Sequence, residues 1–276
     1  MIIRYIVTCQ RYQRKYWRML AFTVLTAVIA SLYFYCGKSL TNMGSIADAY
    51  FLFSNNFVFE TSMFLYVIPL ISSMTAVDIK FDEVNLYPAL FTKINENKFH
   101  IARMVSAIIQ TFIIFFVFLE IIFVLMHIFV DVNNVYILAQ TQLSRQAPIL
   151  TGAPFLSLYL NHYIIYTQIY IFMISIYGAL LSGVSYGISL FLSKKVYVYV
   201  ATFFSSLFAA ALFSFMGTQF ENGLVVLYPQ HLLNPFGSTS VNPGIFTIEF
   251  GLFLWVAILM LVSFILLIVH MKVDLR

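Results

Sequence analysis

Charged side chains are scarce in this sequence. They make up 9% of its 276 residues, whereas a soluble domain carries roughly a quarter. Hydrophobic residues make up 62%, and a soluble fold could not bury that much apolar surface. The composition therefore excludes an ordinary soluble domain and predicts an all-α integral membrane protein, in which the bilayer acts as the solvent.

Cysteine is also scarce. Cys9 lies in a basic N-terminal segment, and Cys36 lies at the far end of the first long apolar run. A disulfide between them would have to cross the membrane. Two such cysteines predict neither a disulfide framework nor a metal site.

The basic residues of the chain lie beside apolar runs and form no continuous stripe on a surface. We therefore expect no nucleic-acid partner.

Motifs of enzymes are missing or out of place. No segment has the phosphate-binding pattern G-x-x-x-x-G-K-[ST], so the chain is not expected to bind ATP by that route. Gly183 to Gly187 matches the G-x-S-x-G hydrolase pattern, which needs a strand-to-helix turn and partner Asp and His residues. Here it lies within an apolar run, and the small residues from Gly178 to Ser189 favour close helix packing. The sequence thus predicts no catalytic residues and no enzyme.

Long apolar runs dominate what is present. A helix that crosses the hydrocarbon core needs about 20 mostly apolar residues. Six candidate runs fall near 19–36, 57–77, 101–129, 162–192, 195–217 and 246–271. The sequence therefore predicts a single transmembrane domain over residues 1–276 with six spans.

The orientation of these spans follows from the placement of Lys and Arg, because positive charges next to membrane helices stay in the cytoplasm. If the spans alternate in direction, only Lys38 and Arg145 fall on the outer side. All other Lys and Arg residues then fall on the inner side. We therefore expect a multi-pass protein of the cell membrane with both termini in the cytoplasm.

Two further segments have mixed composition. Residues 1–18 combine five cations with Ile, Tyr and Trp, which is typical of an amphipathic helix lying on an anionic leaflet; the alternative is a frayed tail with topogenic charges. Residues 218–245 contain three Pro and several Gly among Leu, Val and Phe. They form either a broken, re-entrant extracellular segment before the sixth span or a plain extracellular loop.

The most polar inner loop lies between the second and third runs, over residues 78–100. Asp82 and Glu83 alternate there with apolar residues such as Phe81, Val84 and Leu86, which predicts a short amphipathic element that ends near Pro88. Such an element can dock on a partner. The alternative is an ordinary interhelical loop, since most inner connections are charged.

The order of features along this loop resembles the permease subunits of ABC type-2 exporters. Asp82 and Glu83 match the acidic residues after the second span, and Leu90–Phe91–Thr92 match the hydrophobic turn. The stretch from Lys98 to Arg103 then matches the basic start of the third span. The resemblance extends over nearly the whole chain, from the N-terminal helix through the six spans.

The resemblance implies a function and its partners. The loop would be a cytoplasmic coupling helix that docks on a separate ATPase subunit, which binds ATP and Mg, while this chain binds no cofactor. A second permease copy would complete the path, lined by the second and fifth helices, for an amphipathic, peptide or lipid-like cargo. The residues implied to meet the ATPase are Asp82, Glu83, Val84, Leu86 and Tyr87.

Glu120 lies within the third run and is costly in lipid, which makes it a candidate for function. His127 lies seven residues later on the same helical face. Two isolated ligands make a weak metal site, so a paired or interface role is favoured and no metal is predicted.

The function that competes with the exporter is that of a membrane carrier outside the ABC group, or of an assembly or immunity protein that binds a partner. Carriers often contain internal repeats, and none is evident here.

Overall fold

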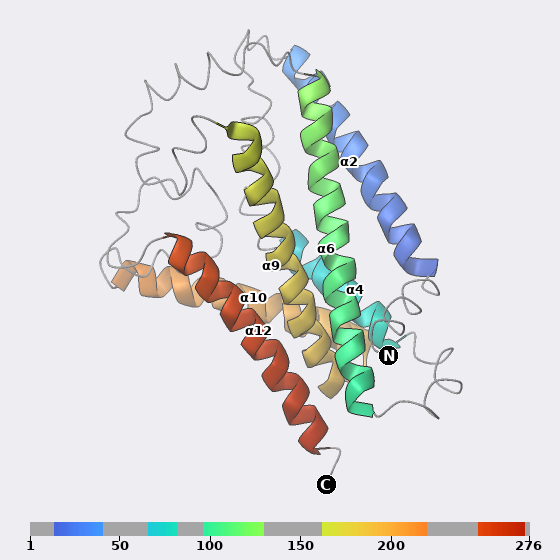
Figure 1. Ribbon diagram of the computed structural model, residues 1–276, viewed down its shortest axis with the longest axis vertical. Coiled ribbons are helices and arrows are strands. Elements are labelled where there is room, and N and C mark those ends of the chain that lie inside the picture. The colour runs from blue at the N-terminus through green and yellow to red at the C-terminus, as the bar shows by residue number, and fades with distance from the viewer. Residues whose placement is uncertain (1–13, 41–65, 82–95, 130–161, 220–247, 274–276) are drawn as a thin grey trace.

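The computed structural model describes residues 14–40, 66–81, 96–129, 162–219 and 248–273, and all of its regular elements there are helices (Figure 1). The predicted all-helical fold is thus confirmed for these residues. The six helices are α2 (Arg14–Leu40), α4 (Ile68–Phe81), α6 (Glu96–Phe129), α9 (Tyr163–Phe191), α10 (Lys195–Gln219) and α12 (Ile248–Val273).

The helices follow the predicted apolar runs, with differences at their ends. The bounds of α9, α10 and α12 agree with the predicted runs to within two residues. By contrast, α2 and α6 begin five residues earlier than predicted, and α4 continues four residues later. Hydropathy detects only the apolar part of a helix, whereas the backbone hydrogen-bond ladder continues into the flanking polar residues.

These longer helices change three of the predicted segments. Residues 14–18 belong to α2 rather than to a separate interfacial helix, and residues 1–13 lie outside the described part. The loop predicted over 78–100 is helical at both ends, so only 82–95 separate α4 from α6. Of the segment 218–245, the first two residues belong to α10 and the rest lies outside the described residues.

Three of the helices contain stretches that are long and apolar enough to cross a membrane, namely Lys98–Leu125, Thr167–Phe191 and Phe253–Lys272. The described side chains also include two shorter apolar stretches, Trp17–Ile29 and Lys195–Ala209. The structure therefore has the helices that a multi-pass membrane protein requires.

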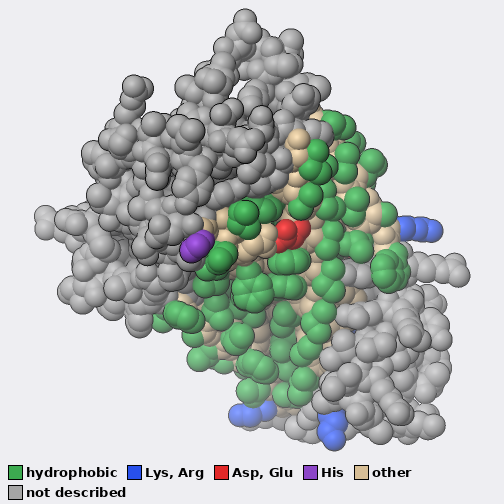
Figure 2. Space-filling view, turned by 45° about the horizontal axis from the view of Figure 1, so that its top comes forward, with side chains coloured by type: hydrophobic (Ala, Val, Ile, Leu, Met, Phe, Trp, Pro, Cys, Tyr) green, Lys and Arg blue, Asp and Glu red, His purple; other side chains and the backbone are tan. Residues whose placement is uncertain are grey.

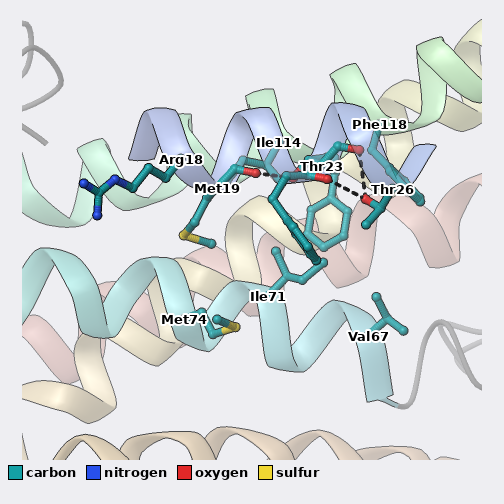
Figure 3. A pocket seen from close by; sticks show the side chains of 11 residues that line it. Arg18, Met19, Thr23, Thr26, Val67, Ile71, Met74, Ile114 and Phe118 are labelled. Carbon is teal, nitrogen blue, oxygen red and sulfur yellow. Dashed lines mark hydrogen bonds between the residues drawn. The ribbon is translucent and has the colours of Figure 1, made fainter. Parts of the chain in front are cut away.

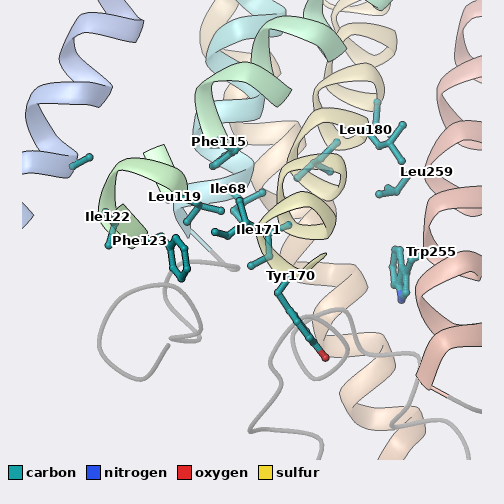
Figure 4. Packing of buried hydrophobic residues seen from close by; sticks show 14 residues of the cluster. Ile68, Phe115, Leu119, Ile122, Phe123, Tyr170, Ile171, Leu180, Trp255 and Leu259 are labelled. Atoms are coloured by element: carbon teal, nitrogen blue, oxygen red, sulfur yellow. The ribbon is translucent and has the colours of Figure 1, made fainter. Parts of the chain in front are cut away.

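Helix α9 is the centre of the arrangement. It packs against α4, α6, α10 and α12, while α2 packs against α6 on the side away from α12 (Figure 1). Figure 4 shows the main buried cluster around α9, to which α4, α6 and α12 contribute. Its members include Ile68, Phe115, Leu119, Tyr170, Ile171, Leu180, Trp255 and Leu259.

Glycines on α9 are the points where its neighbours come closest. A Cβ atom added to Gly178 would lie 2.5 Å from Cε2 of Phe115 on α6, and one added to Gly187 would lie 2.8 Å from Cβ of Leu266 on α12. Gly183 is less tight, with its added Cβ 3.1 Å from Cδ1 of Ile108. The hydrolase-like pattern therefore lies in the middle of a helix, and its small residues allow the close packing that the sequence predicts.

Large apolar side chains cover the outside of the helices. Phe22 on α2, Phe208 on α10 and Phe253 on α12 are each about two-thirds exposed, and hydrophobic side chains occupy most of the coloured face in Figure 2. Exposed apolar surface of this extent indicates an apolar environment such as lipid or a partner subunit.

We expect Gly178→Ala to lower the stability of the protein, because the new methyl group overlaps the buried ring of Phe115. Overpacking of this kind typically costs about 1–3 kcal/mol. Thermal unfolding of the purified chain in detergent measures the change. Gly183→Ala is the matched control and should cost less, because its new methyl group would lie 3.1 Å from both Ile108 Cδ1 and Ser263 Oγ, so these neighbours need to give only a little. Combining Gly178→Ala with Phe115→Leu should recover part of the loss; a Gly178→Ala chain as stable as the original would contradict this packing.

Candidate functional site

The ends of five helices gather at one end of the bundle. The C-terminal turns of α4, α9 and α12 and the N-terminal turns of α6 share a second buried cluster, which contains Ala76, Ile79, Met104, Ala107, Tyr186, Leu190 and Leu267. The start of α10 lies there as well, because the ammonium group of Lys195 is 5.6 Å from the ring centre of Phe81. We call this end of the molecule the basic end.

The name reflects where the cations lie. Lys80, Lys98, Arg103, Lys195 and Lys272 are on these helix ends, and Lys194 directly precedes α10. Arg18 near the start of α2 lies toward the same end, since it lines a groove together with Met74 of α4. Lys38 is at the opposite end of α2. Successive helices therefore run in directions that collect these cations at one end of the bundle.

A buried polar cluster ties the start of α6 to α9 and α12. The Nδ1 atom of His100 lies 3.1 Å from the hydroxyl oxygen of Tyr186, within hydrogen-bond distance. The ring of His100 also meets that of His270 edge-on, with the ring centres 5.3 Å apart. The guanidinium of Arg103 stacks 4.6 Å from the ring centre of Phe99 and is almost fully buried. The two contacts of His100 hold the first turns of α6 against α9 and α12, whereas the Arg103–Phe99 contact lies within α6.

Farther from the basic end, hydroxyl groups tie α4 to α6 and α9. Ser72 donates a hydrogen bond of 2.8 Å to the carbonyl oxygen of Gly178 on α9. The hydroxyls of Thr75 on α4 and Thr111 on α6 are 2.6 Å apart and also hydrogen-bonded. All three side chains are buried. The helices that flank residues 82–95 are therefore joined to each other and to the central helix.

The residues expected to contact an ATPase, Asp82, Glu83, Val84, Leu86 and Tyr87, lie outside the described residues. The structure describes instead the two helix ends that hold this segment. Phe81 ends α4 and Glu96 begins α6, and both of these helix termini are at the basic end. A partner that moved the segment would act on these two helices.

The predicted candidate Glu120 is part of a polar contact between α6 and α9. Gln168 donates a hydrogen bond of 3.1 Å from Nε2 to Oε2 of Glu120. The other carboxyl oxygen, Oε1, is buried and has no hydrogen-bond partner among the described residues. His127 lies on α6, but its side chain is outside the described part. No group of three or more His, Cys, Asp or Glu among the described residues could hold a metal ion.

Sequence reasoning identified Glu120 but missed Gln168, His100 and Tyr186. Gln168 and Glu120 are 48 residues apart in the chain, and His100 and Tyr186 are 86 residues apart. Which of these residues meet therefore depends on how α9 packs against α6. A polar residue within an apolar run, as Gln168 is, was the available signal.

An apolar groove of about 400 Å³ lies between α2, α4 and α6 (Figure 3). Helix α2 contributes one cation and several uncharged side chains, and the other two walls are apolar. The lining residues are Arg18, Met19, Phe22, Thr23, Thr26, Val67, Ile71, Met74, Ile114, Phe115 and Phe118. The groove has no polar group suited to catalysis, and its shape and chemistry fit an apolar chain.

Comparisons of the chain with protein-family models, with curated proteins and with solved structures found no match in any of the three. The resemblance to ABC type-2 permeases therefore stays a prediction.

We expect Glu120 and Gln168 to stabilise the contact between α6 and α9 as a pair. Glu120→Leu leaves the partly buried amide of Gln168 without its acceptor, so it should cost more than Glu120→Gln, which retains an acceptor oxygen. In a double-mutant cycle with Gln168→Leu, unfolding in mixed micelles should give a coupling of about 0.6–1.7 kcal/mol, the average and maximum for such bonds between membrane helices. Strictly additive losses would show that the pair does not hold the helices together.

Proposed function

We propose that this chain is the membrane-spanning subunit of an ATP-driven exporter that works with a separate cytoplasmic ATPase. In this proposal the segment around 82–95 docks on the ATPase through Asp82, Glu83, Val84, Leu86 and Tyr87. Nucleotide binding and hydrolysis occur in the ATPase, and this chain converts the motion into opening and closing of a path.

One observation carries the proposal more than any other: both helix ends that flank this segment are built into the buried cluster at the basic end. A coupling element can transmit force only if the helices beside it move as a unit. The His100–Tyr186 contact and the ring contact of His100 with His270 join α6 to α9 and α12. A displacement at the segment would therefore reach the central helix, because packed elements move between discrete arrangements rather than deform continuously.

The links within the bundle give that displacement a route. The Thr75–Thr111 bond joins α4 to α6, and the bond from Ser72 to the Gly178 carbonyl joins α4 to α9. Contact between α4 and α10 continues the series. The rings of Tyr66 and Phe203 stack there, with centres 5.8 Å apart. Helices α4 and α10 correspond to the second and fifth predicted spans, which would line the transport path.

The proposal includes a topology. The chain would cross the cell membrane of a bacterium six times, with both termini and the basic end in the cytoplasm. The gathering of Lys and Arg at the basic end supports this orientation, because cations are retained on the cytoplasmic side. A second permease copy would enclose the path, and the exposed phenylalanines of α10, such as Phe204 and Phe208, suit a contact with a subunit or with an amphipathic cargo.

Charge reversal in the proposed coupling segment tests the function. We expect a tagged chain, solubilised from its native membrane in a mild detergent, to bring down an ATPase subunit. Asp82→Lys plus Glu83→Lys should abolish this, because a surface complementary to acidic side chains repels the introduced cations. Mass spectrometry of the co-purified proteins, together with their ATPase activity, measures the outcome.

The matched control is Asp82→Glu plus Glu83→Asp, which keeps both negative charges and should retain the ATPase. A well-expressed and intact original chain that recovers no ATPase in several mild detergents would rule out the exporter. The carrier and the partner-binding assembly or immunity protein would then be the remaining classes. Equal recovery with the reversed and the original chains would place the ATPase contact elsewhere.

A further inference from the structure

The groove between α2, α4 and α6 is apolar along its length. The two threonine hydroxyls that line it are already engaged within α2. Thr23 donates to the carbonyl oxygen of Met19, and Thr26 donates to those of Phe22 and Thr23. Their polar atoms thus require no partner from a ligand. Met74, Ile71 and the other apolar lining residues complete a surface suited to a hydrocarbon chain.

The length of the groove matches one half of a bilayer. Along α2 the lining extends from Arg18 to Thr26, and eight residues at the helical rise correspond to about 12 Å. The hydrocarbon core of a membrane is about 30 Å thick, so one leaflet contributes roughly 15 Å. A chain that entered at Arg18 and ended near Thr26 would therefore stay within a single leaflet.

One end of the groove is marked by a cation and an aromatic ring. Figure 3 shows the side chain of Arg18 extending away from the apolar lining at the Met74 end of the groove. The adjacent Trp17 is more than half exposed. Trp is enriched at the level of the lipid headgroups, where Arg also places its charge while its stem covers apolar surface. The groove thus combines an apolar interior with a positive charge at one end only, at the basic end of the bundle.

From this juxtaposition we infer that the groove binds one acyl chain of an anionic phospholipid from the leaflet at the basic end, with the headgroup at Arg18. Charge complementarity selects the occupant. A second copy of the chain would cover the groove with a helix face and would gain nothing from an exposed cation at its end. A phospholipid supplies the apolar chain and the negative charge in one molecule, in the order in which the groove presents their partners.

The inference rests on the placement of α2, α4 and α6 in a membrane, which is part of the proposed function, but it requires no ATPase. The bound lipid would contact α4 and α6, the two helices beside the segment proposed for coupling. Anionic lipid would in this way act on the same helices as the ATPase.

Lipid binding to the purified full-length chain tests the inference. Delipidated protein in detergent is mixed with phosphatidylglycerol or with phosphatidylcholine of identical acyl chains, and bound lipid is counted by native mass spectrometry. We expect phosphatidylglycerol to bind about fivefold more tightly, the ratio that corresponds to one cation near an anionic headgroup. Arg18→Gln should remove this preference and leave the weaker binding of phosphatidylcholine unchanged.

A second substitution tests the apolar part of the groove. Thr23→Phe places a ring in the groove and should reduce the binding of both lipids. Leu25→Phe is the matched control: it adds a ring to an exposed position of α2 that does not line the groove, and it should bind lipid as the original does. If Thr23→Phe fails to fold, as judged by gel filtration and circular dichroism, Arg18→Gln alone decides.

Three outcomes would overturn the inference. The first is equal binding of the two lipids to the original chain, and the second is a preference for phosphatidylglycerol that survives Arg18→Gln. The third is a dimer that Thr23→Phe dissociates without a change in lipid binding, which would make the groove an interface between copies. Loss of lipid selectivity leaves the ATPase recovery unaffected, whereas failure to recover an ATPase leaves the lipid count unaffected, so failure of either proposal can be recognised separately.

Discussion

The close approach of α6 and α12 to α9 is the constraint on which the rest of the structure depends. In an apolar environment the hydrophobic effect does not drive helices together, so their association depends on van der Waals packing and on hydrogen bonds between them. Gly178 and Gly187 lack the Cβ atoms that would meet Phe115 and Leu266. Since α9 packs against four other helices, these two positions set how closely two of them, α6 and α12, approach the central helix.

Polar contacts between helices occur at three levels along this packed centre. His100 and Tyr186 meet at the basic end, Ser72 and Thr75 bond to α9 and α6 farther along, and Gln168 meets Glu120 toward the opposite end. Each contact gives a buried or partly buried polar group a partner that lipid could not supply. These four pairs thus serve as interhelical ties, and they join the helices beside residues 82–95 to the centre of the molecule.

Helix α2 has a different relation to the bundle. Much of its surface is exposed, including Phe22, Leu25 and Ile29, and its described contacts are chiefly with α6. The space it leaves beside α4 is the groove that we assign to a lipid chain. The centre of the bundle is thus packed closely at the glycines of α9, whereas a groove remains between α2, α4 and α6 at its edge.

The sequence by itself predicted an apolar environment for this protein and located its apolar helices. Scarce charge and long apolar runs require helices that satisfy their own backbone, and the runs that became α9, α10 and α12 were located to within two residues because the apolar pattern is continuous. It also predicted that the small residues of α9 pack against neighbours. The helix ends were less predictable, since polar residues at 14–18 and 78–81 continue a helix as readily as they leave it.

Only the tertiary structure decided which residues meet. Glu120 could be selected from the sequence because a carboxylate within an apolar run is costly, but its partner Gln168 is 48 residues away. The same holds for His100 with Tyr186 and for the groove beside Arg18, whose walls come from three helices. Such contacts depend on the rotation and the depth of each helix relative to the next. Those are set by packing at the glycines and the ring of Phe115, not by the pattern within any single run.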